Sequence, residues 1–216
     1  MLRLVVLDVN ETLFPLDPVR DRMAEVGLAG RFDAWFASVL RDGFAAAAAG
    51  RFASFGDLAR HHLEVLLAGR PGGAVDHVLA GFQHVVPHPD VAGGLEALQR
   101  AGIRAVALTN GSGEVTRRNL DRVGLASLVH AVHDVAEVGR WKPAPEPYQA
   151  VLAAHATDAA DAAMVAVHPW DVLGGQQVGM VGAWLDRSGA PYPAAYGAPD
   201  VTGGDLASLA AQLVGR

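Results

Sequence analysis

Short apolar runs, each ended by polar residues, divide much of the chain into alternating strands and helices. Residues 2–7 form one such run that stops at Asp8, and residues 104–108 form another that stops at Thr109. Runs of this kind are typical of strands buried on both faces of a sheet. Three further strands are predicted over residues 128–132, 164–167 and 180–185. Helical patterns cover residues 91–101, 114–123, 146–156, 171–178 and 204–214. This alternation predicts a Rossmann-like α/β core, with a parallel sheet and helices on both faces.

One long segment interrupts the alternation of strand and helix. Between residues 17 and 86 there is no convincing strand, and helical patterns recur over residues 18–26, 32–49, 55–67 and 74–85. A run of helices at this point predicts a helical cap inserted after the first strand. We therefore expect an α/β core made of residues 1–16 and 87–216, and a cap made of residues 17–86.

Composition narrows the partners that the protein is expected to have. The 216 residues are 51% hydrophobic and 19% charged, carry a net charge of −6, and include no cysteine. Disulfides, thiolate metal sites and a thiol nucleophile are therefore excluded. No basic block suggests nucleic acid, and no uncharged apolar run approaches the length of a membrane span. We expect a cytoplasmic protein that acts on a small anionic molecule, with a homodimer left open as its assembly.

Polar residues with catalytic potential follow the predicted strands. In open parallel sheets, ligands bind beyond the carboxyl ends of the strands. The loop before the predicted helix 146–156 contributes the only lysine among 17 lysines and arginines. An aspartate that faces a lone lysine is suited to act as an ionised carboxylate nucleophile. The residues concerned are Asp8, Asn10, Thr109, Asn110, Lys142, His168 and Asp171.

The order of these residues resembles four motifs of the haloacid dehalogenase superfamily of aspartate-nucleophile hydrolases. Residues 5–13 (Val-Val-Leu-Asp-Val-Asn-Glu-Thr-Leu) resemble its first motif, with Asp8 in the position of the nucleophile. Residues 108–111 (Leu-Thr-Asn-Gly) resemble the second motif, and residues 142–148 (Lys-Pro-Ala-Pro-Glu-Pro-Tyr) the third. Residues 168–171 (His-Pro-Trp-Asp) occupy the position of the fourth. The resemblance spans nearly the whole chain.

The asparagine at position 10 favours one branch of that superfamily. Phosphatases of the superfamily have a second aspartate at this position, which protonates the leaving alkoxide, and an amide cannot do so. A halide leaving group needs no proton, and the type II L-2-haloacid dehalogenase branch lacks the second aspartate. Residues 35–41 (Trp-Phe-Ala-Ser-Val-Leu-Arg) resemble the cap helix of that branch, in which Arg41 would help to hold the substrate and the halide. Asn110 and Trp170 match positions that line its pocket.

The resemblance implies a reaction and a role for each residue. Asp8 would displace halide from a small 2-haloalkanoic acid and form an ester, which water would cleave to the 2-hydroxy acid. Lys142 would keep Asp8 ionised, and Asp171 would orient Lys142 or the water. Thr109 and Asn110 would hold the Asp8 carboxylate, and His168 would assist. Three residues depart from the branch: Asn10 replaces an aromatic residue, Ala166 a serine and His168 an asparagine. No cofactor is expected for this reaction.

Two other functions fit parts of the sequence. In a Mg²⁺-dependent phosphatase of the same superfamily, Asp8, Asp171 and a backbone carbonyl near Asn10 would hold the metal, because Mg²⁺ prefers oxygen ligands. The departures at Asn10, Ala166 and His168 would instead suit a binding protein that keeps the fold without catalysis. Dependence on a metal separates the first alternative from the dehalogenase, and absence of turnover identifies the second.

Overall fold

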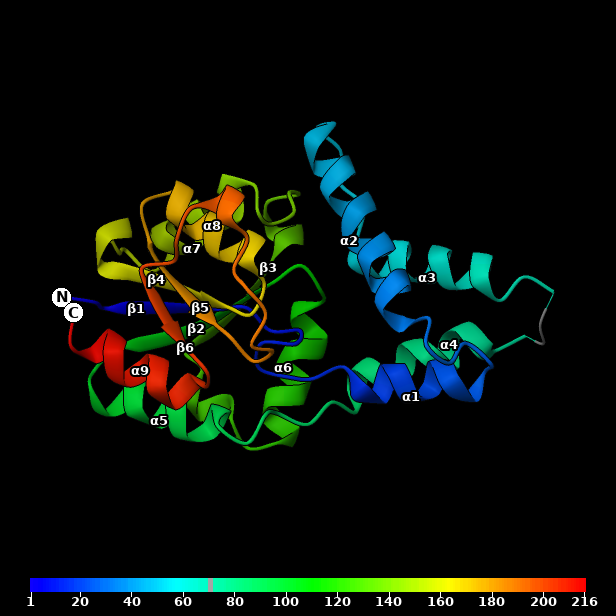
Figure 1. Cartoon of the computed structure of the whole chain (residues 1–216), viewed down its shortest axis with the longest axis horizontal. Helices are drawn as coiled ribbons and strands as arrows, with labels where there is room; N and C mark the ends of the chain where they lie inside the picture. Colours follow the sequence, from blue (N-terminus) through cyan, green and yellow to red (C-terminus); the bar gives the residue numbers. More distant parts are fainter. Residues whose placement is uncertain (70–71) are drawn as a thin grey trace.

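The computed structural model describes residues 1–69 and 72–216 and contains the predicted Rossmann-like α/β core. Its sheet has six strands in the order β3-β2-β1-β4-β5-β6, and each neighbouring pair is parallel. The strand that bears Asp8 at its end, β1, lies between β2 and β4, near the centre of the sheet (Figure 1). The strands are β1 (Leu4–Leu7), β2 (Arg104–Thr109), β3 (Ala131–Asp134), β4 (Ala162–Ala166), β5 (Val181–Leu185) and β6 (Val201–Gly203).

Alternate side chains of the buried strands fill two cores, one on each face of the sheet. Val5 and Leu7 of β1 belong to the larger core, together with residues of α5 (Val91–Arg100) and α9 (Leu206–Val214). Leu4 and Val6 belong to the smaller core, together with residues of α7 (Pro145–Ala154) and α8 (Pro169–Gln177). Figure 1 shows these two pairs of helices on opposite sides of the strands. Burial on both faces is the reason that the strands are continuous apolar runs.

Two strands differ most from the sequence-based prediction. The third predicted strand, over residues 128–132, begins too early, because residues 126–128 form a 3₁₀ turn and the strand itself is Ala131–Asp134. The short edge strand β6 was not predicted at all. Only three residues long, with Thr202 exposed at its centre, it is too brief to produce an apolar run.

A separate helical lobe follows β1, at the position predicted for the cap (Figure 1). Its helices are α1 (Asp17–Glu25), α2 (Phe32–Ala48), α3 (Phe55–Leu66) and α4 (Ala74–Leu79), followed by a 3₁₀ turn over Ala80–Gln83. The helix predicted over residues 74–85 therefore ends early. The cap boundaries at residues 17 and 86 stay a prediction, and Arg70 and Pro71 lie outside the described residues.

Aromatic side chains join the helical lobe to the core. The ring of Phe55 stacks on that of Trp141, with their centroids 6.1 Å apart, and the Trp141 indole N–H donates to the backbone carbonyl of Ala53 at 2.8 Å. Gly43 of α2 also lies against Trp141, where a Cβ atom would approach a ring carbon to 2.4 Å. Only glycine fits this contact, so α2 packs closely over the loop that precedes Lys142.

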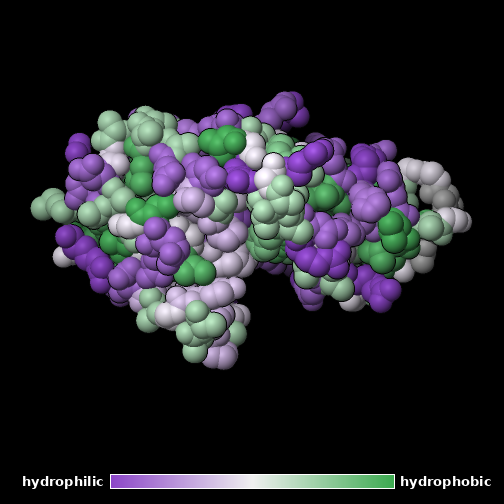
Figure 2. Space-filling model, turned by 90° about the horizontal axis from the view of Figure 1, so that it is seen from above, coloured by the Kyte–Doolittle hydropathy of each residue, from purple (hydrophilic) through white to green (hydrophobic). Residues whose placement is uncertain are grey.

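The exterior has a mixed character. Figure 2 shows hydrophilic and hydrophobic residues interspersed over both lobes. Within the described part of the chain, no helix combines the length and the apolarity that a membrane crossing requires.

Candidate active site

Lys142 connects two aspartates at the carboxyl edge of the sheet. Its side chain is fully buried, and its ammonium donates to Asp8 Oδ1 at 2.9 Å and to Asp171 Oδ2 at 2.6 Å. A third hydrogen bond, of 2.7 Å, goes to the backbone carbonyl of Leu108 at the end of β2. The three donors of the ammonium are therefore matched by three acceptors from three different elements.

Local structure holds each member of this cluster in place. Asp8 directly follows β1, and its backbone N–H donates to the carbonyl of Val165 in β4 at 3.0 Å. Asp171 lies in the first turn of α8, where a helix N-terminus favours a carboxylate. Asn110 fixes the backbone of Lys142, because its side chain donates to Lys142 O at 3.3 Å and accepts from Lys142 N at 2.9 Å.

The second oxygen atom of each carboxylate also has a donor. Thr12 donates its hydroxyl proton to Asp8 Oδ2 at 2.6 Å and accepts from the backbone N–H of Val167 at 3.1 Å. Tyr148 donates to Asp171 Oδ1 at 2.5 Å. All four carboxylate oxygens are thus hydrogen-bonded, and both side chains are held in one orientation.

The two carboxyl groups differ in pKa. Burial alone would raise the pKa of Asp8, but attraction to Lys142 and the hydrogen bond from Thr12 together hold it below its ordinary value. Burial raises the pKa of Asp171, and the negative charge of Asp8 raises it further. Burial alone would lower the pKa of Lys142, but attraction to the two carboxylates raises it. The ammonium therefore stays charged. Of the two carboxyl groups, Asp8 is therefore the one suited to remain an anion.

The same hydrogen bonds surround the position at which the phosphatase alternative would bind Mg²⁺. Lys142 occupies the position between Asp8 and Asp171, and the remaining oxygens accept from Thr12 and Tyr148. Magnesium requires near-octahedral oxygen coordination, so an ion between the two aspartates would use the lone pairs that these hydrogen bonds leave free. Among the described residues there is also no group of three or more histidines or carboxylates arranged to hold a metal. The Mg²⁺ site of the phosphatase alternative therefore stays a prediction.

A small cavity of about 10 Å³ opens beside Asp8. Its walls come from the carboxyl edge of the sheet on one side and from α2 and α3 of the helical lobe on the other. His168 stacks on Trp170, with ring centroids 5.1 Å apart, and its Nε2 atom lies 3.9 Å from Asp8 Oδ2. The residues that line it are Asp8, Asn10, Phe36, Leu40, Phe55, Thr109, Asn110, His168 and Trp170.

Glu11 adds a second carboxylate near His168. Its Oε2 atom lies 3.5 Å from His168 Nε2. The backbone of Glu11 has φ 64°, a left-handed conformation that is uncommon for residues other than glycine. The Glu11 N–H donates to Phe14 O at 2.7 Å, which holds this turn just after the nucleophile. Burial raises the pKa of Glu11.

The structure brings together most of the residues singled out in the sequence. Asp8, Lys142 and Asp171 are in direct contact, and five others line the cavity. These five are Asn10, Thr109, Asn110, His168 and Trp170. Two details differ from expectation: the Asn110 side chain binds the backbone of Lys142, and the Thr109 hydroxyl oxygen accepts from Gly111 N at 2.9 Å.

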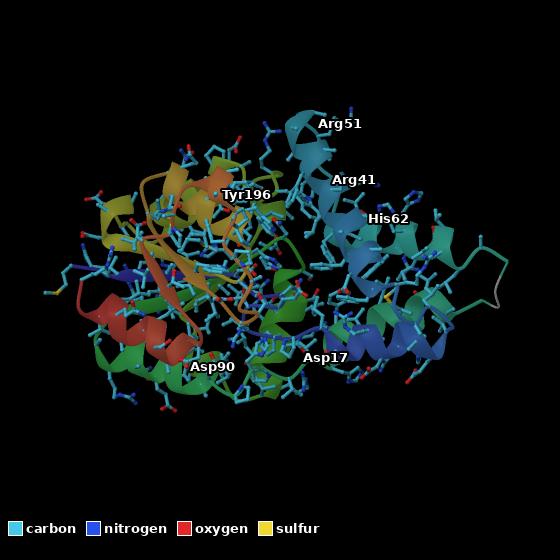
Figure 3. All side chains as sticks on the ribbon, in the orientation of Figure 1. Asp17, Arg41, Arg51, His62, Asp90 and Tyr196 are labelled. Carbon is cyan, nitrogen blue, oxygen red and sulfur yellow. The ribbon has the colours of Figure 1, made fainter. Side chains whose placement is uncertain are left out.

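Arg41 lies outside the cavity, contrary to the expectation that it holds substrate and halide. Its side chain is 67% exposed and forms a surface ion pair with Asp42 at 2.6 Å. Figure 3 shows it on α2, in the helical lobe near His62 and away from the strands. The reason is helical geometry. Phe36 and Leu40 share the face of α2 that lines the cavity, and the next residue points about 100° away from that face.

Three contributors were not assigned roles from the sequence. Thr12, Tyr148 and Glu11 each lie within or beside a motif that was recognised. For Thr12, the signal was its position four residues after Asp8, at the first turn beyond the strand. For Tyr148, it was a phenol in the helix that follows Lys142, a residue type that needs a polar partner when buried. No comparable signal marked Glu11, because its position follows from the turn conformation.

This combination of a parallel Rossmann-like sheet, a helical lobe after the first strand and a buried Asp-Lys-Asp cluster defines a class of capped α/β hydrolases. The family model for haloacid dehalogenase-like hydrolases matches residues 2–179, and the chain belongs to that family.

The names of the relatives describe two different activities, dehalogenation and phosphate ester hydrolysis. Haloacetate dehalogenase H-2 of Moraxella sp. (strain B) is 28% identical over 121 residues, which cover 56% of this chain and 54% of that protein. Phosphoserine phosphatase of Thermus thermophilus is 35% identical over 121 residues, covering 55% and 48%. The chain thus spans about half the length of these curated relatives. Among solved structures, the L-2-haloacid dehalogenase RSc1362 has a TM-score of 0.90 and 25% identity, with 100% of this chain and 99% of that chain covered.

Proposed function

We propose that the protein hydrolyses a 2-haloalkanoic acid to the 2-hydroxy acid through an ester on Asp8. The observation that carries the proposal is the Asp8 carboxylate, held ionised by a fully buried Lys142 at the wall of a small cavity. The haloacetate dehalogenase among its relatives supports the same reaction class.

The reaction has two steps. An oxygen of Asp8 attacks C2 of the substrate, a C–O bond forms, and the halide departs with the electron pair of the C–halogen bond. Water then attacks the carbonyl carbon of the Asp8 ester and breaks its bond to the alkoxy oxygen. The 2-hydroxy acid leaves with one proton of the water, the second proton is released, and Asp8 is again a carboxylate. We assign to Asp171 the role of orienting Lys142, whose ammonium donates to it at 2.6 Å.

His168 is the basic side chain among the described residues that line the cavity. Because Arg41 lies elsewhere, we assign to the His168 N–H the role of holding the substrate carboxylate or the departing halide. Asn10 lines the same cavity and has no acidic proton to give to a leaving alkoxide, which favours a halide leaving group over a phosphate ester.

The test is halide release from (S)-2-chloropropionate and from chloroacetate, each with and without a chelator. Turnover that is unaffected by the chelator supports the proposal. Asp8→Asn should abolish turnover and remain folded, because an amide is a poor nucleophile of nearly the same shape. The matched control is Asp33→Asn, since Asp33 has an 81% exposed side chain on the helical lobe. A single turnover in ¹⁸O-labelled water should place the label in Asp8, and label found only in the product would contradict the ester.

The phosphatase is retained as a second candidate because of the 35% identity to a phosphoserine phosphatase. Asn10→Asp separates the two functions. A well-placed general acid contributes about 10²–10⁴-fold, so latent phosphate release should rise with Mg²⁺ present while halide release falls. Efficient phosphate release by the unaltered protein, lost with chelator and unchanged in Asn10→Asp, would favour the phosphatase. Lack of turnover on both substrate panels would favour a binding protein.

A further inference from the structure

A second and larger cavity adjoins the one beside Asp8. Its volume is about 170 Å³, against about 10 Å³ for the smaller cavity. A volume of about 10 Å³ holds at most a single water molecule, so of these two cavities only the larger one has room for a chain of carbon atoms. Asn10, Phe55 and Thr109 line both cavities and therefore mark the boundary between them.

The lining of the larger cavity is mainly apolar and carries no charge. Phe14, Phe82 and Val85 contribute to its walls, and none of the described residues that line it is acidic or basic. Its buried polar groups already have partners within the protein. The Asn119 amide donates to Phe82 O at 2.8 Å, and the Thr116 hydroxyl donates to Ser112 O at 3.0 Å. A ligand here meets few unpaired polar groups, which suits a hydrocarbon.

We infer that this cavity holds the apolar tail of the substrate, so that the preferred 2-halo acid carries an alkyl or aryl chain of several carbons. The inference rests on the proposed function, since it extends the substrate away from the carbon that Asp8 attacks. With C2 and the carboxylate beside Asp8 and His168, the remaining chain passes Asn10 into the larger cavity. The small cavity alone would accommodate little beyond the reacting carbons.

Chain length supplies the first test. Each methylene moved from water into an apolar lining should raise kcat/KM roughly fourfold. From (S)-2-chloropropionate to (S)-2-chlorohexanoate, three added methylenes should therefore raise kcat/KM for halide release by roughly sixtyfold. A value that stays flat or falls along the series would overturn the tail pocket while leaving the proposed reaction in place.

A variant that fills the cavity supplies the second test. Val115 is a half-buried residue of α6 (Gly113–Arg122) on the cavity wall, and it does not line the smaller cavity. Val115→Trp should lower the ratio of kcat/KM for the six-carbon to the three-carbon substrate by more than roughly tenfold, the equivalent of about two methylenes. The matched control is Val214→Trp at the exposed end of α9, which should leave the ratio unchanged. Leu79→Phe, on the same cavity wall, replaces Val115→Trp if that variant fails to fold.

Binding of unreactive carboxylic acids distinguishes a failure of the proposed reaction from a failure of the proposed tail pocket. Hexanoate should bind more tightly than propanoate by the same roughly sixtyfold, measured by calorimetry, and Val115→Trp should remove most of this difference. If no haloacid is turned over but hexanoate shows this pattern, the proposed reaction is wrong and the tail pocket stands. If hexanoate binds no more tightly than propanoate, the tail pocket is wrong.

Discussion

Replacing Lys142 with methionine should destabilise the protein strongly at neutral pH and much less in acid. Methionine keeps the approximate length of the side chain but removes the charge and three hydrogen bonds of 2.6–2.9 Å. Two buried carboxylates then face each other without a cation. Removing one partner of a buried ion pair costs about 3–5 kcal/mol, and we expect a loss of this size at pH 7. It would be a large share of the roughly 5–15 kcal/mol by which domains are stable.

The pH dependence follows from the carboxylates. In the unaltered protein the pKa of Asp8 is below its ordinary value of 3.8, so Asp8 contributes stability above pH 3.8, which is lost as pH falls through the lower folded value. Without Lys142, burial raises the pKa of both Asp8 and Asp171 above their ordinary values. These groups then destabilise the variant above pH 3.8, and protonation relieves the penalty as pH falls. The raised pKa of Lys142 changes stability only near and above pH 10.5, outside this window.

Urea unfolding at pH 7 and pH 4.5 measures the effect. We expect the difference between Lys142→Met and the unaltered protein to be clearly smaller at pH 4.5. Adding Asp171→Asn should restore part of the stability at pH 7, because it removes one of the two stranded charges. The control is Arg100→Met, a surface arginine with a 69% exposed side chain, which should change stability by less than about 0.5 kcal/mol. A loss under 1 kcal/mol at pH 7, or an equal loss at both pH values, would refute the reasoning about buried charge.

Two further predictions test where side chains lie around the site. Arg41→Ala should leave the rate of halide release within about twofold, because Arg41 forms a surface ion pair with Asp42 and such pairs contribute little. A rise in KM of about tenfold would show that Arg41 does reach the substrate. Gly174→Ala should lower both stability and kcat, because a Cβ atom there would lie 2.3 Å from the Tyr148 hydroxyl, which holds Asp171. Overpacking of this kind costs about 1–3 kcal/mol, measurable by urea unfolding, and an unchanged kcat would mean that Tyr148 does not position Asp171 for catalysis.

The sequence was most informative where burial and chemistry left a pattern in a single segment. The central strands were predictable because their two buried faces make continuous apolar runs, whereas β6, with three residues, leaves no such run. Lys142 was identifiable because it is the only lysine and lies beside a helix start.

Other features depend on contacts between segments that no local pattern encodes. Arg41 occupies a recognisable helix, but the face of that helix that meets the core is decided by the packing of Phe36 and Gly43. The larger cavity is lined by residues of both α3 and α6, which are far apart in the sequence. Neither could have been placed without the fold.

The attachment of the helical lobe has a consequence for how the substrate range of such a protein changes. Leu13 and His88 stand on either side of the helical lobe in the sequence, and the His88 N–H donates to Leu13 O at 3.0 Å, so the two ends of this segment are adjacent. The lobe can be treated as one long loop between two adjacent points of the core. The entropic cost of closing a loop rises only slowly with the length of the loop. The closure entropy of the lobe therefore changes little when it grows or shrinks away from its contacts with Trp141. Asp8, Lys142 and Asp171 all belong to the core, while Phe36 and Leu79 belong to the lobe. Selection on the lobe can thus alter which molecule enters while the hydrolytic residues stay as they are.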